Sequence, residues 1–220
     1  MKLEKYKKQI PAKIYAGLEK RNLTELRPSQ IKSIKAGLFK DKNLLVCTPT
    51  GSGKTLVSEM AILNSLYNNV GKAVYIVPLK ALANEKYKEF KKRYPEFNVG
   101  LAIGDIDSPG SYLKNFDIII CTAERLDSLL RHHAPWIKDV KTVTIDEIHL
   151  LNDPGRGPTL EILITILRTL LKNIQIIGLS ATIGNPDELA QWLDAELIKD
   201  KWRPVELHQG VFLDNKIEFV

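Results

Sequence analysis

Short apolar runs rich in β-branched residues alternate along the chain with longer amphipathic stretches. The apolar runs occupy residues 43–48, 73–78, 99–103, 117–121, 142–146 and 174–180. The stretches between them, at residues 54–67, 79–94, 123–132 and 158–171, have a helical pattern of apolar positions. Continuous apolar strands that alternate with helices are typical of a parallel sheet buried on both faces. The pattern therefore predicts a doubly wound α/β domain that binds its ligands beyond the carboxyl ends of its strands.

The length of 220 residues suits one large domain and is sufficient to bury a substantial core. Residues 205–220 have the pattern of extended segments without a further helix. We expect one domain at residues 1–204, and at residues 205–220 a linker or the start of a connection to a second lobe. A coding sequence that ended in such a segment would be unusual, so we expect an expressed fragment.

Composition excludes some classes of protein. Apolar residues make up 44% and charged residues 26% of the chain, which is ordinary for a soluble globular protein and argues against whole-chain disorder. The net charge of +6 favours polyanionic partners only mildly. Glu85, Glu89 and Glu96 dilute the basic residues between positions 86 and 93, so that stretch is better explained as a solvated helix face.

The two cysteines, Cys47 and Cys121, lie inside apolar runs and form no CxxC pair. They are predicted to be buried, reduced thiols of a cytoplasmic protein. The N-terminus has no apolar signal region, and no stretch has the roughly 18 apolar residues of a membrane span. His132 and His133 have no acidic or cysteine partners at metal-binding spacing, so a surface helix end is the better interpretation.

A glycine-rich segment connects the first apolar run to the first long helical stretch. It consists of Pro49, Thr50, Gly51, Ser52, Gly53, Lys54 and Thr55. The glycines allow the backbone N–H groups to turn toward a phosphate, and the helix N-terminus adds positive potential. Lys54 is expected to reach the β- and γ-phosphates, and the Thr55 hydroxyl to bind Mg²⁺. The segment departs from the usual phosphate-loop pattern at one position, because Thr48 replaces the first glycine.

Two adjacent carboxylates, Asp146 and Glu147, end a later apolar run. Asp146 is positioned to hold Mg²⁺, and Glu147 to orient and deprotonate an attacking water molecule. Adjacent carboxylates at a strand end also occur as solvated loop residues. The catalytic interpretation therefore depends on the phosphate loop that accompanies them.

These motifs, taken in order, resemble those of the superfamily 2 helicases. Residues 146–149 look like the DExH box, and residues 180–182 look like the family's Ser-Ala-Thr motif. Residues 78–82 and 121–125 resemble two motifs that contact nucleic acid. Gln30 lies upstream of the phosphate loop, where the family has a glutamine that reads adenine. The resemblance covers essentially the whole chain and implies a RecA-like domain with ATP and Mg²⁺ as cofactors.

The resemblance also assigns roles to individual residues. It implies that Ser180, Ala181 and Thr182 couple hydrolysis to strand movement and that His149 links them to the catalytic carboxylates. It implies contacts to the sugar-phosphate backbone from Pro78, Lys80, Gly104, Asp105, Thr122 and Arg125. Simpler explanations stay open at two places, because residues 104 and 105 could form a turn and Lys80 could be an ordinary surface lysine.

Finer features resemble the archaeal repair helicases of the superkiller-like branch. These are residues 153–157, 184–189 and 202–205. The resemblance implies the first RecA-like lobe of a 3′–5′ DNA helicase of fork repair, with forked or single-stranded DNA and a second lobe of the same chain as its partners. RNA helicases belong to the same branch, so RNA stays open as the nucleic acid.

Two rival classes of protein share part of this pattern. A phosphate-loop kinase or recombinase-type ATPase has the same loop and an acidic strand end, but it does not call for Gln30 or the Ser-Ala-Thr motif. A non-enzymatic module could hold a nucleotide as a regulator, although the presence of Lys54, Asp146 and Glu147 argues against a degenerate site. Both classes stay open at the level of the sequence.

Three further residues invite functional interpretations that the sequence does not favour. Trp136 and Trp202 could stack on bases, but single tryptophans beside proline are usually packing residues. Arg156 could act as an arginine finger, but the family's fingers come from the second lobe. We therefore expect Arg156 to serve lobe packing or a structural salt bridge.

Overall fold

A single parallel sheet organises the chain. The computed structural model describes residues 1–104, 110–181, 183–206, 208, 210–213 and 216–219. Within these, seven strands pair in the order β3-β4-β2-β5-β6-β1-β7, and every pair is parallel. The strands are β1 (Leu44–Cys47), β2 (Lys72–Val77), β3 (Val99–Ala102), β4 (Ile118–Thr122), β5 (Val140–Ile145), β6 (Gln175–Ser180) and β7 (Glu196–Lys199). The doubly wound α/β prediction is confirmed.

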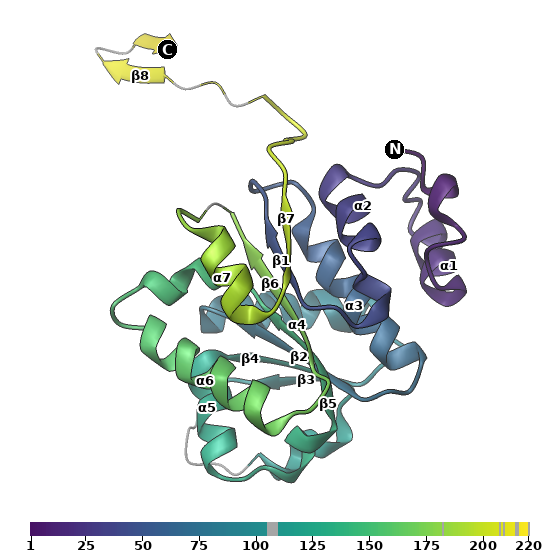
Figure 1. The fold of residues 1–220 in the computed structure, drawn as a ribbon, viewed down its shortest axis with the longest axis vertical. Helices are drawn as coiled ribbons and strands as arrows, with labels where there is room; N and C mark the ends of the chain where they lie inside the picture. The colour runs from purple at the N-terminus through teal and green to yellow at the C-terminus, as the bar shows by residue number, and fades with distance from the viewer. Residues whose placement is uncertain (105–109, 182, 207, 209, 214–215, 220) are drawn as a thin grey trace.

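Helices cover both faces of the sheet (Figure 1). One face packs against α1 (Ala12–Lys20), α2 (Pro28–Lys35), α3 (Lys54–Tyr67) and α4 (Lys80–Arg93). The other packs against α5 (Ala123–Arg131), α6 (Gly157–Leu170) and α7 (Pro186–Leu193). Alternate strand residues supply the two cores: Leu44 and Val46 belong to the first, and Leu45 and Cys47 to the second. Both faces are apolar, and this explains the continuous apolar runs in the sequence.

Shorter elements complete the chain. The 3₁₀ segments are η1 (Leu3–Tyr6), η2 (Leu38–Lys40), η3 (Ser111–Asn115), η4 (Pro135–Asp139) and η5 (Ile148–Asn152). Strands β8 (Gly210–Leu213) and β9 (Lys216–Phe219) pair antiparallel beyond the main sheet, and Figure 1 shows them apart from it. The extended pattern expected after position 204 is therefore present. The domain boundary after Pro204 stays a prediction.

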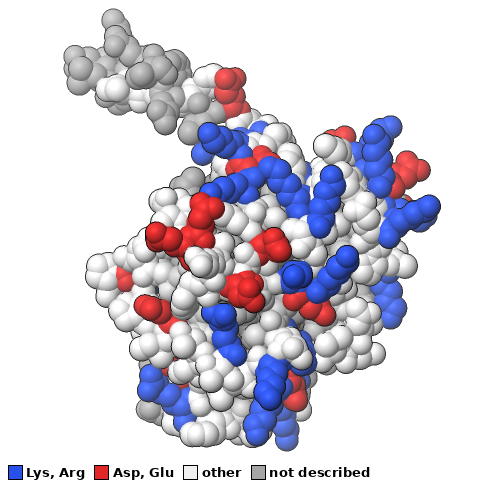
Figure 2. Space-filling view, viewed as in Figure 1, with Lys and Arg blue, Asp and Glu red and all other residues white. Residues whose placement is uncertain are grey.

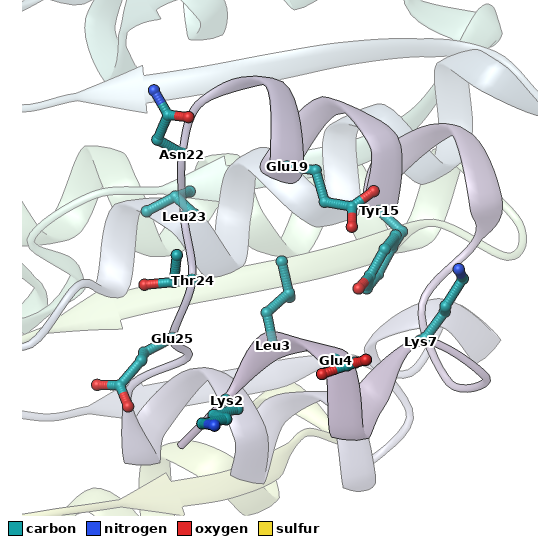
Figure 3. A pocket seen from close by; sticks show the side chains of 10 residues that line it. All are labelled: Lys2, Leu3, Glu4, Lys7, Tyr15, Glu19, Asn22, Leu23, Thr24 and Glu25. Atoms are coloured by element: carbon teal, nitrogen blue, oxygen red, sulfur yellow. The ribbon is translucent and has the colours of Figure 1, made fainter.

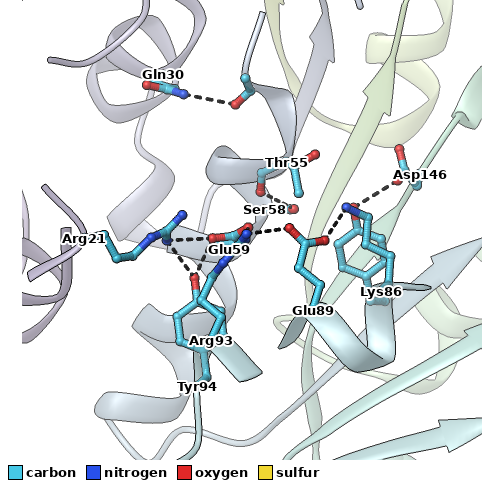
Figure 4. Close-up of polar contacts among 12 residues, drawn as sticks. Arg21, Gln30, Thr55, Ser58, Glu59, Lys86, Glu89, Arg93, Tyr94 and Asp146 are labelled. Atoms are coloured by element: carbon cyan, nitrogen blue, oxygen red, sulfur yellow. Dashed lines mark hydrogen bonds and ion pairs between the residues drawn. The ribbon is translucent and has the colours of Figure 1, made fainter. Parts of the chain in front are cut away.

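Buried charge anchors the helix that follows the phosphate loop. Glu59 on α3 is 2% exposed, and its carboxylate accepts hydrogen bonds from Arg21 at 2.9 Å and from the Tyr94 hydroxyl at 2.5 Å. Arg93 on α4 forms an ion pair with the other carboxylate oxygen. Figure 4 shows these side chains converging on Glu59 from both sides. The network ties α1 and α4 to α3, and through α3 it supports the nucleotide site.

The cysteine and tryptophan side chains differ in how deeply they are buried. Cys47 and Cys121 are free and buried, as predicted, and burial raises the pKa of the Cys47 thiol to about 11 and that of Cys121 to about 12. Trp136 is buried in the second core, as expected of a packing residue. Trp202 differs, because its side chain is 39% exposed. Within the described residues, no helix has the length and apolar character to cross a membrane.

Candidate nucleotide site and adjoining nucleic-acid groove

The phosphate loop lies at the carboxyl end of β1 and leads directly into α3. Gly51 and Gly53 have φ values of +80° and +89°, a region that glycine adopts readily and that other residues avoid. The Lys54 ammonium folds back over the loop and donates to the Thr48 carbonyl oxygen at 2.8 Å. Burial lowers the pKa of Lys54, and the carboxylates of Glu147 and Asp146 oppose that shift. The lysine thus lies within the electrostatic reach of both predicted catalytic carboxylates.

The threonine that replaces the first glycine of the loop has a structural role. Thr48 is fully buried, and its hydroxyl is 2.7 Å from the hydroxyl of Ser52, on the opposite side of the loop. Its backbone N–H donates to the Ser180 carbonyl oxygen at 3.2 Å and so extends the β1–β6 ladder. The hydrogen bond between the Thr48 and Ser52 hydroxyls therefore restrains the loop at position 48, where glycine could make no such bond.

The Gln30 side chain bridges α2 and the phosphate loop. Its Oε1 accepts from the Arg27 backbone N–H at 2.8 Å, and its Nε2 donates to the Gly53 carbonyl oxygen at 3.1 Å (Figure 4). A Cβ on Gly53 would lie 2.5 Å from Gln30 Nε2, so glycine is required there for contact as well as for conformation. Gln30 lies beside the loop as predicted, but both ends of its amide are bonded to backbone groups. Its role toward adenine stays a prediction.

The two predicted catalytic carboxylates lie at the end of β5, across from the phosphate loop. Asp146 accepts from the Tyr75 hydroxyl at 3.0 Å and from the Glu147 backbone N–H at 3.1 Å. Glu147 adopts a left-handed conformation with φ of +52°. Such strain in a non-glycine residue costs on the order of 1–3 kcal/mol and concentrates at functional sites. The carboxylate oxygen Oε2 of Glu147 is buried without a hydrogen-bond partner among the described residues.

His149 lies between the carboxylates and β6. Its Nδ1 is 3.3 Å from Glu147 Oε2 and 3.3 Å from the Ser180 hydroxyl. Ser180 is fully buried at the end of β6, and Ala181 follows it at half burial. Thr182, the third predicted coupling residue, lies outside the described residues. The structure thus brings His149, Glu147 and Ser180 together, whereas the coupling role assigned to them stays a prediction.

A groove of about 400 Å³ opens beside these residues, at the ends of β2 and β4. It is lined by Pro78, Leu79, Lys80, Gly104, Thr122, Glu124, Arg125 and Arg156. All of the predicted nucleic-acid residues that the structure describes are in this lining, and Asp105 lies outside the described residues. Three cations face one carboxylate in the groove, a balance that favours a phosphate-bearing ligand.

Individual groove residues differ in how accessible they are to a ligand. Lys80 is exposed at the first turn of α4. Gly104 has φ of +95° with open space where a side chain would begin, so a ligand can approach the backbone closely there. The Thr122 hydroxyl caps α5 by accepting from the Arg125 N–H at 3.4 Å. Arg125 is only 3% exposed, so its side chain is less accessible to a sugar-phosphate backbone than the predicted contact requires.

Arg156 lines the groove, a place that its sequence position did not indicate. Its side chain is exposed, and among the ion pairs of the described residues none involves Arg156, so the structural salt bridge is not found there. A role in lobe packing stays a prediction. Arg156 also lines a small cavity together with Pro78, Glu124 and Asp146. A residue of the groove thus shares a cavity with the aspartate that is predicted to bind Mg²⁺.

Arg27 is a neighbour of the phosphate loop whose contact the sequence did not reveal, and its side chain also contacts Trp202. The Arg27 guanidinium donates to the Gly51 carbonyl oxygen and lies over the Trp202 ring at 5.6 Å from its centroid. Arg27 directly precedes α2, and Trp202 follows β7, so the contact joins distant parts of the chain. No local pattern signals such a pair.

Away from the groove, positive and negative side chains are mixed. Among the described residues, a cavity of about 580 Å³ between η1, α1 and residues 22–25 is lined by both lysines and glutamates, which Figure 3 shows spread around its rim. Figure 2 shows basic and acidic side chains interleaved across the visible face. On that face the charges are therefore distributed and not gathered by sign.

The donor set fits Mg²⁺ and a nucleotide triphosphate. Thr55 and Asp146 supply a hydroxyl and a carboxylate, the kinds of oxygen ligand that Mg²⁺ prefers. Oε2 of Glu147 makes no hydrogen bond among the described residues and has only the 3.3 Å contact with His149 Nδ1, so this carboxylate oxygen has the chemistry to accept a proton from bound water. A phosphate loop, two carboxylates at a neighbouring strand end and a parallel sheet together define a RecA-like nucleotide-binding domain.

Comparison with known proteins agrees with this class. The sequence model of the DEAD/DEAH box helicase family matches residues 27–189, and the chain belongs to that family. Membership removes the kinase and recombinase classes and confirms the superfamily resemblance. A DEAD/DEAH box domain implies nucleotide binding.

The relatives include archaeal enzymes. The ATP-dependent DNA helicase Hel308 of Pyrococcus horikoshii is 53% identical over 214 residues, which cover 96% of this chain and 29% of that protein. Hel308 of Methanocaldococcus jannaschii is also 53% identical, over 216 residues that cover 94% of this chain and 18% of that protein. The chain therefore spans less than a third of the length of these relatives.

A solved structure shows the same fold. The DUF1998 helicase MrfA bound to DNA and AMPPNP superposes with a TM-score of 0.74 at 29% identity. The match covers 88% of this chain and 29% of the MrfA chain. The RecA-like fold expected from the sequence is thus confirmed.

Proposed function

We propose that this chain is the ATP-binding lobe of an ATP-dependent DNA helicase, with 3′–5′ polarity and a role in replication-fork repair. The observation that carries the proposal is the shared edge of the sheet. Asp146 and the groove residues Pro78, Glu124 and Arg156 line one small cavity. A movement of Asp146 when the nucleotide is hydrolysed would therefore reach residues of the groove directly. The similarity to Hel308 supports DNA over RNA.

In this proposal the lobe binds Mg-ATP through the phosphate loop. Lys54 neutralises charge on the β- and γ-phosphates, and Thr55 and Asp146 hold the magnesium ion. Glu147 accepts the proton of the attacking water, because its Oε2 makes no hydrogen bond among the described residues and has only the 3.3 Å contact with His149 Nδ1. Bound Mg²⁺ contributes charge neutralisation on the triphosphate.

The groove is proposed to hold the sugar-phosphate backbone. Lys80 and Arg156 are exposed cations on its rim, whereas Thr122 and Gly104 offer a hydroxyl and an open backbone. Such contacts position a strand without reading its bases. His149 and Ser180 are proposed to transmit hydrolysis to strand movement, and their 3.3 Å contact supports this role. A second lobe of the same parent chain is the proposed partner.

Equilibrium binding of a labelled single strand tests the groove. Lys80→Ala and Arg156→Ala should each weaken binding to every DNA sequence and reduce the salt dependence by about one phosphate contact. Lys138→Ala is the matched control, because Lys138 is an exposed cation on η4, just before the amino end of β5. Equal losses of affinity in all three variants would refute the groove as the binding site of the strand. Equal or tighter binding of an RNA strand of the same sequence would favour RNA as the natural ligand.

A further inference from the structure

The Tyr75 side chain occupies an unusual place for a polar group in a sheet core. Tyr75 lies on β2 and is fully buried. The register aligns Tyr75 with Thr144 and Ile76 with Ile145 on β5. Tyr75 and Asp146 therefore project toward the same face, the one covered by α3 and α4. The Tyr75 hydroxyl lies 3.0 Å from Asp146 Oδ2 and donates to it.

Both oxygens of the Asp146 carboxylate are held. Oδ2 accepts from Tyr75, and Oδ1 accepts from the Glu147 backbone N–H at 3.1 Å. The Asp146 backbone N–H in turn donates to the Ile76 carbonyl oxygen at 2.9 Å. The backbone hydrogen bond to Ile76 fixes the position of the Asp146 main chain, from which the carboxylate extends. The Tyr75 hydroxyl is the side-chain donor that fixes its rotation.

The core around Tyr75 is closed on one side by the phosphate-loop helix. Val57 and Met60 of α3 belong to the same core as Tyr75. The first turn of α3 contains Thr55, whose carbonyl oxygen accepts from the Ser58 hydroxyl at 2.8 Å (Figure 4). Asp146 and Thr55 are the residues proposed to hold the magnesium ion, and Tyr75 contacts the first of them directly.

We infer that Tyr75 is a positioning residue of the magnesium site, whose hydroxyl fixes the rotation of the Asp146 carboxylate. The inference rests on the proposed Mg-ATP function and adds to it a residue outside the recognised motifs. A carboxylate fixed before the ion arrives loses less rotational freedom on binding, so Tyr75 strengthens Mg²⁺ binding without touching the ion.

The competing explanation is a core tyrosine whose hydroxyl merely finds an acceptor. The ring does pack in the first core, edge-on to Phe90 with centroids 5.5 Å apart. Tyr75→Phe separates the two explanations, because it keeps the ring and removes only the hydroxyl. Tyr94→Phe is the matched control: it removes another buried hydroxyl that donates to a carboxylate, that of Glu59, outside the proposed magnesium-binding pair.

The experiment titrates Mg²⁺ against binding of a fluorescent ATP analogue to the 220-residue chain. Tyr75→Phe should raise the Mg²⁺ concentration for half-maximal binding by roughly 10- to 150-fold, the effect expected for one hydrogen bond to a charged group. Nucleotide binding in EDTA should not change. Tyr94→Phe should lower the thermal unfolding midpoint and leave the Mg²⁺ requirement at the wild-type value. Adding Tyr75→Phe to Asp146→Asn should shift the requirement no further, because the hydroxyl acts through that carboxylate.

Three outcomes would overturn the inference and leave the proposed function standing. The first is an unchanged Mg²⁺ requirement in Tyr75→Phe, and the second is an equal shift in Tyr94→Phe. The third is an additive effect of Tyr75→Phe and Asp146→Asn. A wild-type chain whose nucleotide binding ignores Mg²⁺ would instead overturn the proposed function, and the inference with it.

Discussion

At the scale of single residues, the site combines groups that the sequence reveals with conformations that it does not. The identities of Lys54, Asp146 and Glu147 follow from motif and strand position alone. The left-handed backbone of Glu147 and its buried Oε2 depend on η5 and its surroundings. Thr48 departs from the loop pattern, and only its hydroxyl contact with Ser52 shows why it fits. Side-chain partners across strands are not encoded locally, so these details require the fold.

Replacing the predicted base separates binding from chemistry. In a form of the protein that contains both lobes, Glu147→Gln should keep nucleotide binding and reduce turnover by roughly 10²–10⁴-fold, because an amide cannot accept the proton of water. Lys54→Ala should instead weaken triphosphate binding itself. Steady-state turnover and analogue binding, measured side by side, give both quantities. Wild-type turnover by Glu147→Gln would show that another group is the base.

The Gln30 amide gives a second test at this scale. Gln30→Ala should weaken ATP binding more than GTP binding, since a polar group left unpaired at the base costs about 1–3 kcal/mol. Both nucleotides should also lose some affinity, because the amide holds the phosphate loop through the Gly53 carbonyl. Competition titrations with the two nucleotides measure the difference. Equal losses would leave Gln30 with the loop-holding role alone.

At the scale of secondary-structure elements, the apolar runs predicted six strands and four helices, each of which the structure places within two residues of its predicted bounds. The edge strand β7 and α7 were missed because they are short and β7 is half exposed, so its pattern is weak. The N-terminal helices α1 and α2 were also not anticipated, although they cover one face of the sheet. The groove was predicted by residue, but its shape depends on how β2, β4 and α6 converge.

The Glu59 network should matter for the stability of these elements. Glu59→Ala removes the acceptor that joins Arg21, Arg93 and Tyr94 and leaves buried donors without it. Breaking a fully buried pair costs about 3–5 kcal/mol, but the arginine side chains are 30% and 27% exposed and can rehydrate. We therefore expect a loss of about 2–3 kcal/mol after allowing for solvent screening.

Urea unfolding followed by circular dichroism measures that loss. Lys86→Ala provides the comparison, because it breaks a helix pair whose carboxylate, that of Glu89, is 29% exposed and can rehydrate, so the loss should be no more than about 1 kcal/mol. Similar midpoints for wild type and Glu59→Ala would show that the network does not hold α1 and α4 to α3.

At the scale of the whole molecule, one edge of one sheet carries both sites. The phosphate loop, the carboxylates and the groove all follow carboxyl strand ends, and Arg156 lines the cavities that connect them. The sequence predicted this common edge because, apart from Gln30, the motifs directly follow apolar runs, and parallel strands bring their carboxyl ends together. It could not predict that Arg156 joins the groove, since that depends on the path of η5 into α6.

The extent of the chain sets its expected activity. It spans 29% of the Hel308 protein of Pyrococcus horikoshii, and in the proposed mechanism a second lobe supplies the arginines that stabilise the transition state. Such an arginine is worth roughly 10³–10⁵ in rate in other phosphate-loop enzymes. The groove of this lobe should likewise hold only part of the phosphate contacts, so affinity should be weak and fall with salt in proportion to the contacts that remain.

We therefore predict that the 220-residue chain, assayed alone, folds and binds ATP or ADP weakly but neither unwinds a duplex nor shows strong DNA-stimulated hydrolysis. Joining it in cis to the remainder of the helicase core should restore both activities, because the nucleotide would then lie between two lobes. Duplex unwinding and phosphate release, each measured with and without a single strand, test this. A Glu147→Gln chain prepared in the same way controls for contaminating ATPase. Robust strand-stimulated turnover by the chain alone, absent from that control, would contradict the two-lobe mechanism.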